Sequence, residues 1–242
     1  MRRYTYDAKN YPLSEIALGS IQKHYPDVQD LSLLHEHVPA KKIGELAKII
    51  GKDLADTNFY KIFDKLLEDY VSLGEILVQR FGNIRINIPN QDKDGTVLPF
   101  HQGQWVGNGL GLRTVWLPFT DAYDSNSLQL VNLMDSRAIT DACKEWDYLR
   151  LQEECKKYCE PVNIRKGQFI LFTQEHIHGA AANRTGKTRM SIDVRLLLKD
   201  GQPHRKWPGA YFRKLHDTDI HSRKVEIKDN DNVVMFSSYN SV

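Results

Sequence analysis

The chain has 242 residues, of which 33 are basic and 31 are acidic. Because the charge is nearly balanced, the composition gives no indication of binding to nucleic acid or to an anionic membrane surface. No segment approaches the ~18 consecutive apolar residues of a membrane span, and the first residues lack the apolar core of an export signal. We therefore expect a single cytoplasmic domain, long enough to bury a substantial core.

The first part of the chain has the pattern of helices. One helix is expected to end near Gly51, and a second begins near Phe59. From there apolar residues recur at intervals of three and four through about residue 80, which is typical of an amphipathic helix: Phe59, Ile62, Phe63, Leu66, Leu67, Tyr70, Leu73, Ile76 and Leu77. Gly82-Asn83 then breaks the pattern and ends the helix.

Short strands and turns follow. Residues 84–88 alternate between apolar and polar side chains, as in a strand with one buried face. Further strands are predicted at 113–119, 169–172 and 189–195, whereas the charged stretch 135–160 is expected to be helical. That stretch contains the three cysteines. Because their number is odd and no structural-zinc spacing surrounds them, we interpret them as ordinary reduced thiols.

The order of these elements predicts the fold class. Helices first and strands later favour an α+β domain in which N-terminal helices buttress an antiparallel barrel. We expect residues 1–82 to form the helical part, 83–198 the barrel core and 199–242 a C-terminal tail. The tail could cover the mouth of the barrel as a lid, or it could mediate a homodimer.

Two histidines and an arginine are the candidate site residues of the strand-rich part. His178 follows one predicted strand, and Arg189 lies on the next, with Ser191 two residues further and so on the same face. His101 lies upstream, just past a proline. An imidazole and a guanidinium that face one interior suit a site for a metal and an anionic ligand.

These residues resemble those of the Fe(II)/2-oxoglutarate-dependent oxygenases, in particular the branch similar to phytanoyl-CoA dioxygenase. That family has a His-x-Asp/Glu motif, then a distal His, then an Arg-x-Ser. Here Arg189-Met190-Ser191 matches the last motif, and 189 − 178 = 11 matches the spacing. Because of this spacing we select His178 over His176, which would share its strand face. Residues 116–123 also look like the strand after the first metal ligand in members from antibiotic and sugar pathways.

The resemblance implies a double-stranded β-helix, or cupin-like jelly roll, with a mononuclear iron site. It implies that His101 and His178 bind Fe(II). It also implies that Arg189 and Ser191 hold the distal carboxylate of 2-oxoglutarate and that Thr114 reaches the same cofactor. The implied reaction is oxidation, typically hydroxylation, of an unactivated C–H bond. The substrate would be a polar small molecule, such as a sugar or an amino-acid derivative.

The chain departs from the family at the third metal ligand. Non-haem iron oxygenases hold Fe(II) by two histidines and one carboxylate, but here Gly103 stands in place of the carboxylate. If the strand continues past His101, Gly103 alone shares its face, whereas a bend at the glycine could bring Gln104 inward. Gln102 is a weaker candidate because it would point away.

Three interpretations of Gly103 therefore remain. The position can be open, as in related halogenases, where a halide occupies it. A glutamine amide oxygen can replace the carboxylate. Alternatively, the site has lost iron, and the chain is a non-catalytic cupin-like binding module. The sequence favours the open position over ligation by Gln104.

Overall fold

The computed structural model describes residues 1–90, 98–199, 201, 211–217, 220–221, 225–229 and 232–236. The helices are α1 (Leu13–Gln22), α2 (Leu34–His37), α3 (Ile43–Asp53), α4 (Phe59–Tyr70), α5 (Leu133–Ala142) and α6 (Tyr148–Tyr158). The strands are β1 (Arg2–Thr5), β2 (Ile76–Gln79), β3 (Asn83–Asn87), β4 (Leu112–Pro118), β5 (Leu128–Val131), β6 (Cys159–Pro161), β7 (Gln168–Thr173), β8 (His178–Ala180), β9 (Arg189–Leu198), β10 (Phe212–Lys214), β11 (Val225–Asp229) and β12 (Asn232–Phe236). In the described part, no helix is long and apolar enough to cross a membrane.

The helical pattern that begins at Phe59 ends earlier than the sequence indicates. α4 stops at Tyr70, so the expected continuation to about residue 80 is wrong. Gly74 adopts a φ of +69°, which is readily accessible only to glycine and turns the chain. Ile76–Gln79 then form β2, in which Ile76 pairs with Leu198 of β9. The pairing with β9 fixes these residues in a strand, despite their helical spacing.

One antiparallel sheet of seven strands forms the centre of the fold. Its order is β1-β7-β4-β9-β2-β10, and β3 also pairs with β9. The ten-residue strand β9 pairs with three other strands of this sheet. Along one edge of β9, the first half pairs with β3 and the last residues pair with β2, and the other edge pairs with β4. β1 and β2 come from the part expected to be helical and β10 from the expected tail, so the predicted boundaries at 83 and 198 do not delimit the sheet.

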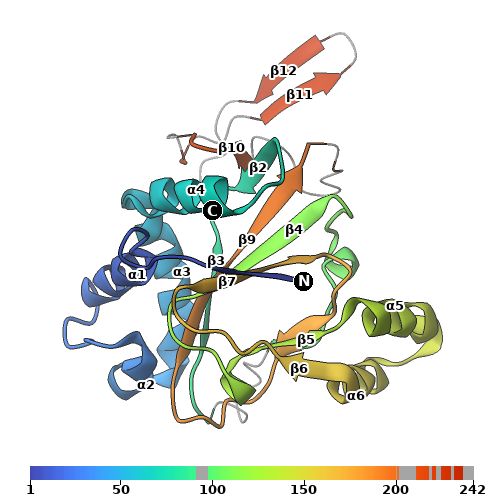
Figure 1. The fold of residues 1–242 in the computed structure, drawn as a ribbon, viewed down its shortest axis with the longest axis horizontal. Helices are drawn as coiled ribbons and strands as arrows, with labels where there is room; N and C mark the ends of the chain where they lie inside the picture. Colours follow the sequence, from blue (N-terminus) through green and yellow to red (C-terminus); the bar gives the residue numbers. More distant parts are fainter. Residues whose placement is uncertain are drawn as a thin grey trace.

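The two faces of this sheet differ in character. Along β9, the even-numbered residues from Met190 to Leu196 are fully buried and pack against α1, α3 and α4. The odd-numbered residues from Arg189 to Arg195 lie on the opposite face, since strand side chains alternate. Figure 1 shows α1–α4 together on one side of the sheet, with α5 and α6 on the other side. Helices therefore buttress an antiparallel sheet, as expected.

A second sheet covers the polar face of the first. It contains β6, β5 and β8 in that order. A cluster of buried apolar residues from both sheets lies between them: Trp116, Ala122, Leu128, Leu130, Val162, Ile164, Ile170 and Phe172. The described strands thus form two facing sheets rather than a closed barrel. The space between them receives the odd-numbered side chains of β9 and the end of β8 at His178.

Candidate metal and cofactor site

The structure brings His101 and His178 together. Their backbones form a reciprocal pair of hydrogen bonds, with N···O distances of 2.9 Å in each direction. The two ring centroids are 4.4 Å apart. Nδ1 of His101 lies 2.9 Å from the carbonyl oxygen of Pro99, and Nδ1 of His178 lies 3.0 Å from that of His176. Since a carbonyl only accepts, each Nδ1 carries the proton and each Nε2 keeps a free lone pair.

Both rings are neutral at neutral pH. Burial lowers the pKa of His101, and burial together with the nearby charge of His101 lowers the pKa of His178 to about 3. Neutral imidazole is the form that binds a metal, and a second hydrogen bond at Nδ1 is the usual way to orient such a ligand. Two imidazoles suit Fe(II) among other first-row metals. The donor set that these residues present therefore fits the metal that the sequence indicates.

Arg189 and Ser191 form a second group, as expected. Arg189 is buried; its Nε donates to the carbonyl oxygen of Asn126 at 2.9 Å and its Nη1 donates to Oγ of Ser191 at 3.0 Å. Trp116 donates from Nε1 to the same Oγ at 3.1 Å. Because Ser191 accepts both bonds, its own hydroxyl proton is left to donate to a carboxylate. Burial lowers the pKa of Arg189 to about 10, so it stays cationic at neutral pH.

Thr114 lies on the same face of the sheet but apart from Arg189. In the register of β4 and β9, Thr114 is opposite Arg195, whereas Pro118 is opposite Ser191. The two positions on β4 are four residues apart, 118 − 114, which corresponds to about 13 Å along a strand. The hydroxyl of Thr114 accepts a hydrogen bond from Nε2 of Gln174 at 2.8 Å. The structure thus groups Thr114 with Gln174 rather than with Ser191.

His176, the alternative to His178, lies in a different environment. Its Nδ1 is 2.9 Å from Oγ1 of Thr173. Burial lowers its pKa to about 4, and the charges that act on it include the N-terminus, Glu175 and Arg137. By contrast, Asp193 and Arg195 of β9 act on the pKa of both His101 and His178. This difference separates His176 from the histidine pair.

The backbone bends immediately after His101. Gly103 has helical angles, φ −57° and ψ −34°, and precedes a short 3-10 helix, η4 (Gln104–Val106), so the strand does not continue. Gln102 is buried and directs its Nε2 to Oγ1 of Thr140 at 3.2 Å and to the carbonyl oxygen of Glu175 at 2.5 Å. Its amide group is therefore engaged with α5 and with the turn after β7.

The space beside Gly103 is occupied by the side chain of Gln174. A Cβ atom built on Gly103 would lie 1.9 Å from Oε1 and 2.8 Å from Cδ of Gln174. Atoms at such distances overlap, so no side chain fits at residue 103 unless Gln174 moves. In the part of the chain that the structure describes, no group of three or more His, Cys, Asp or Glu side chains could hold a metal. A third ligand of one of these types is accordingly absent from the described residues.

A group of charged side chains on the same face was missed by the sequence reasoning. Nε of Arg85 lies 3.1 Å from Oδ1 of Asp193, and Nη1 of Arg195 lies 3.5 Å from Oδ2 of the same carboxylate. The charges of all three residues act on the pKa of His101. The alternation of residues 84–88 and 189–195 could have identified this group, because it places Arg85 and the odd residues of β9 on polar faces.

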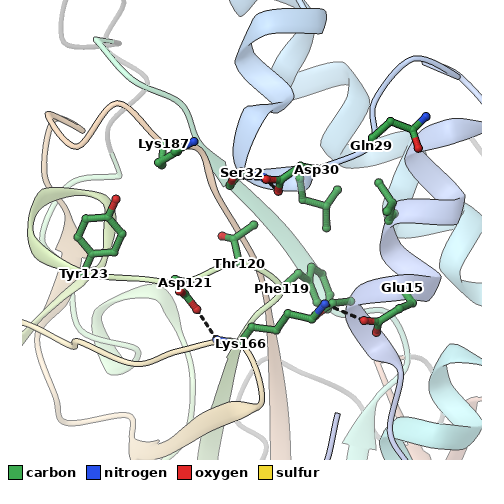
Figure 2. A pocket seen from close by; sticks show the side chains of 13 residues that line it. Glu15, Gln29, Asp30, Ser32, Phe119, Thr120, Asp121, Tyr123, Lys166 and Lys187 are labelled. Carbon is green, nitrogen blue, oxygen red and sulfur yellow. Dashed lines mark hydrogen bonds and ion pairs between the residues drawn. The ribbon is translucent and has the colours of Figure 1, made fainter. Parts of the chain in front are cut away.

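A separate pocket lies on the helix side of the sheet. Figure 2 shows this cavity of about 430 Å³, which is lined by residues of α1, of the loop before the 3-10 helix at Leu31–Leu33 and of the segment after β4. An ion pair of 2.7 Å joins Lys166 to Glu15 at its side. Its wall includes Phe119, which belongs to the core that packs on the helices. Neither His101 nor His178 lines the cavity, so we place the candidate site between the two sheets instead.

Comparison with known proteins decides the family. The model of the family described as phytanoyl-CoA dioxygenase (PhyH) matches residues 46–191, which is more than half of the chain. The chain belongs to this family. The phytanoyl-CoA dioxygenase family consists of 2-oxoglutarate-dependent non-haem iron dioxygenases, so the protein is an oxidoreductase with Fe(II) and 2-oxoglutarate as its cofactors.

Solved structures match the chain at low sequence identity. They include AviO1 from Streptomyces viridochromogenes Tue57, with 12% identity, 83% of this chain and 89% of that chain covered and a TM-score of 0.48. The non-heme monooxygenase ThoJ in its nickel complex has 15% identity, 86% and 78% coverage and a TM-score of 0.45. HygX from Streptomyces hygroscopicus, with nickel and 2-oxoglutarate bound, has 11% identity, 84% and 83% coverage and a TM-score of 0.44. No curated protein sequence gives a significant match.

Proposed function

We propose that the protein hydroxylates an unactivated C–H bond of a polar small molecule in the space between the two sheets. His101 and His178 bind Fe(II), and Arg189 with Ser191 holds the distal carboxylate of 2-oxoglutarate. The observation that carries this proposal is the histidine pair itself. Both Nδ1 atoms are committed to backbone carbonyls, so two neutral Nε2 donors are left on residues that pair through an isolated β-bridge. In this proposal the two sheets are the walls of a double-stranded β-helix.

The oxidant for C–H cleavage is dioxygen; Fe(II) and 2-oxoglutarate, when bound, would activate it, with one oxygen atom going to the substrate and the other to 2-oxoglutarate, which loses carbon dioxide. The residues of the chain orient the reactants. The carbonyl oxygens of Pro99 and His176 fix the rings of the two histidines. Trp116 lies with its ring 5.8 Å from the guanidinium of Arg189 and shields it from water. The fixed guanidinium and the hydroxyl of Ser191 then present donors to a carboxylate at one place only, which positions the cofactor for reaction.

The charged side chains that line this face of the sheet, here called the charged wall, favour a polar substrate that carries an anionic group. Arg85, Arg189, Arg195 and Asp193 share one face of the sheet, and their charges sum to 3 − 1 = +2. The guanidinium of Arg195 has a buried Nε without a hydrogen-bond partner in the described part. The side chain of Arg85 is 42% exposed and so remains accessible to a ligand. A carboxylate or phosphate of the substrate would complete this set of donors.

Anaerobic titration with Fe(II) and 2-oxoglutarate tests the proposed function. Binding of both at the histidine pair predicts a visible charge-transfer band near ~500 nm, as the cofactor chemistry of this class requires. A well-folded protein without this band would instead be a binding module, and a change of the band on adding chloride would indicate halogenation. The cytoplasmic location and the homodimer expected from the sequence stay predictions.

A further inference from the structure

Gln174 occupies the space where a side chain of residue 103 would begin. A side chain at residue 103 would start at a Cβ only 1.9 Å from Oε1 of Gln174 and 3.1 Å from its Cβ. The glycine and the glutamine are therefore complementary, because one supplies the space that the other fills. They lie 174 − 103 = 71 residues apart in the sequence, so this relation is visible only in the fold.

Hydrogen bonds hold the Gln174 amide in this place. Its Nε2 donates to Oγ1 of Thr114 at 2.8 Å, and its Oε1 accepts from Nδ2 of Asn108 at 3.0 Å. The backbone N–H of Asn108 in turn donates to the carbonyl oxygen of Gly103 at 3.0 Å. This bond joins the two ends of the turn that contains η4, so Asn108 connects that turn to Gln174. Gln174 is 2% exposed, so the amide group is both buried and oriented.

This amide lies on the same side of the sheet as the histidines. Thr114 is opposite Phe172 in the register of β4 and β7, and the ring of Phe172 is 5.0 Å from that of His178. Oδ1 of Asn108, next to Gln174, is buried without a hydrogen-bond partner in the part of the chain described. A buried oxygen without a donor is unfavourable, and the approach of a cation or of a further donor would satisfy it.

We propose that Gln174 replaces the carboxylate of the facial triad and supplies a neutral amide oxygen as the third protein donor beside His101 and His178. Asn108 and Thr114 are positioning residues for this amide. The metal site then carries one negative charge less than a His-His-carboxylate site. The amide is a weaker ligand than a carboxylate, and it leaves no empty position beside Gly103 for a halide. This inference depends on the proposed metal site at the histidine pair.

Carboxylates introduced at the two positions test the inference. Gln174→Glu is isosteric and keeps Asn108 as a donor, while the hydroxyl of Thr114 can turn to donate to it. We expect it to tighten the binding of Fe(II) or Ni(II), measured anaerobically by isothermal titration, by about tenfold or more. Gly103→Asp should not tighten binding, and overlap with Gln174 should lower the thermal unfolding midpoint by several degrees. Gly103→Asp/Gln174→Gly removes the overlap and should restore both the midpoint and tight binding.

Gln168→Glu, at the start of the strand β7 that leads to Gln174, is the control for an added charge, and it should leave metal affinity unchanged. If Gly103→Asp alone tightens binding and Gln174→Glu does not, the inference is overturned. If Gln174→Glu fails to fold, the double variant decides: tighter binding than in Gly103→Asp supports the inference, and equal binding refutes it. Failure of the proposed function gives a different result. In that case, replacing His101 or His178 by alanine would leave the metal affinity of the protein unchanged.

Discussion

The contacts of Arg189 determine how strongly it can bind the distal carboxylate of 2-oxoglutarate. A guanidinium has five N–H donors. Two of them are used within the protein, by the Asn126 carbonyl oxygen and by Oγ of Ser191, so 5 − 2 = 3 remain, on Nη1 and Nη2. Because Nε is engaged, only the end of the fork formed by Nη1 and Nη2 is left for a carboxylate. We therefore expect 2-oxoglutarate to bind Arg189 end-on, with Ser191 as an additional donor.

Arg189→Ala should weaken binding of 2-oxoglutarate by roughly 2–4 kcal/mol, which is the cost of removing one partner of a buried charge pair. This corresponds to an increase in Kd of ~30- to ~700-fold. The hydroxyl of Ser191 and Nε1 of Trp116 remain in the variant and can donate to the ligand, so the lower half of this range is expected. Arg189→Lys should recover little, since an ammonium group has no planar fork to match a carboxylate.

Isothermal titration of the metal-loaded protein with 2-oxoglutarate measures this effect. Circular dichroism must first show a native fold, because Arg189→Ala also removes the donor of the Asn126 carbonyl oxygen. Arg113→Ala is a suitable control, since Arg113 lies on β4 and donates only to the nearby carbonyl oxygens of Leu110 and Leu112 in the described part. An unchanged affinity in Arg189→Ala would remove Arg189 from the cofactor site and refute the reasoning above.

Further predictions concern the metal ligands and the stability of the fold. His101→Ala and His178→Ala should each abolish stoichiometric iron binding while the circular dichroism spectrum stays native. His176→Ala should keep most of the iron. If His176→Ala loses the iron and His178→Ala keeps it, the choice of His178 as the ligand is wrong. Asp64→Ala should lower the free energy of unfolding by ~3–5 kcal/mol in urea denaturation, because it leaves a buried charge uncompensated. Asp64 accepts two bonds from Arg213, at 2.5 and 2.7 Å, and both side chains are almost fully buried. A loss below about 1 kcal/mol, typical of exposed pairs, would contradict this expectation.

The sequence predicts the faces of strands well, because alternation is a local property. It places Arg189 and Ser191 on one face, and the structure joins them by a hydrogen bond of 3.0 Å. The same rule, applied to residues 84–88, assigns Arg85 to the polar face that it occupies. Where a strand ends is not local in this way. The sequence leaves open whether a strand continues past His101 or the chain bends at Gly103, and the structure has the bend, into η4.

Pairing between distant segments accounts for the remaining errors. The apolar spacing near residue 76 is helical, yet those residues pair with β9, more than a hundred positions later. Likewise, Gly103 indicates a missing ligand, but only the fold brings Gln174 against it. In both cases the deciding contact lies outside any local window, so periodicity and motif spacing cannot reveal it.

The neutral third position connects the metal site to the charged wall. With two neutral imidazoles and an amide, the protein ligands compensate none of the charge of Fe(II). The wall of Arg85, Arg189, Arg195 and Asp193 adds a further positive excess. Doubly anionic 2-oxoglutarate balances only part of this charge, so an anionic substrate should bind more tightly than a neutral analogue of the same shape. Competition titrations at increasing salt test this, because the preference must weaken as the charges are screened. A preference that is independent of salt would show that contacts other than charge select the substrate.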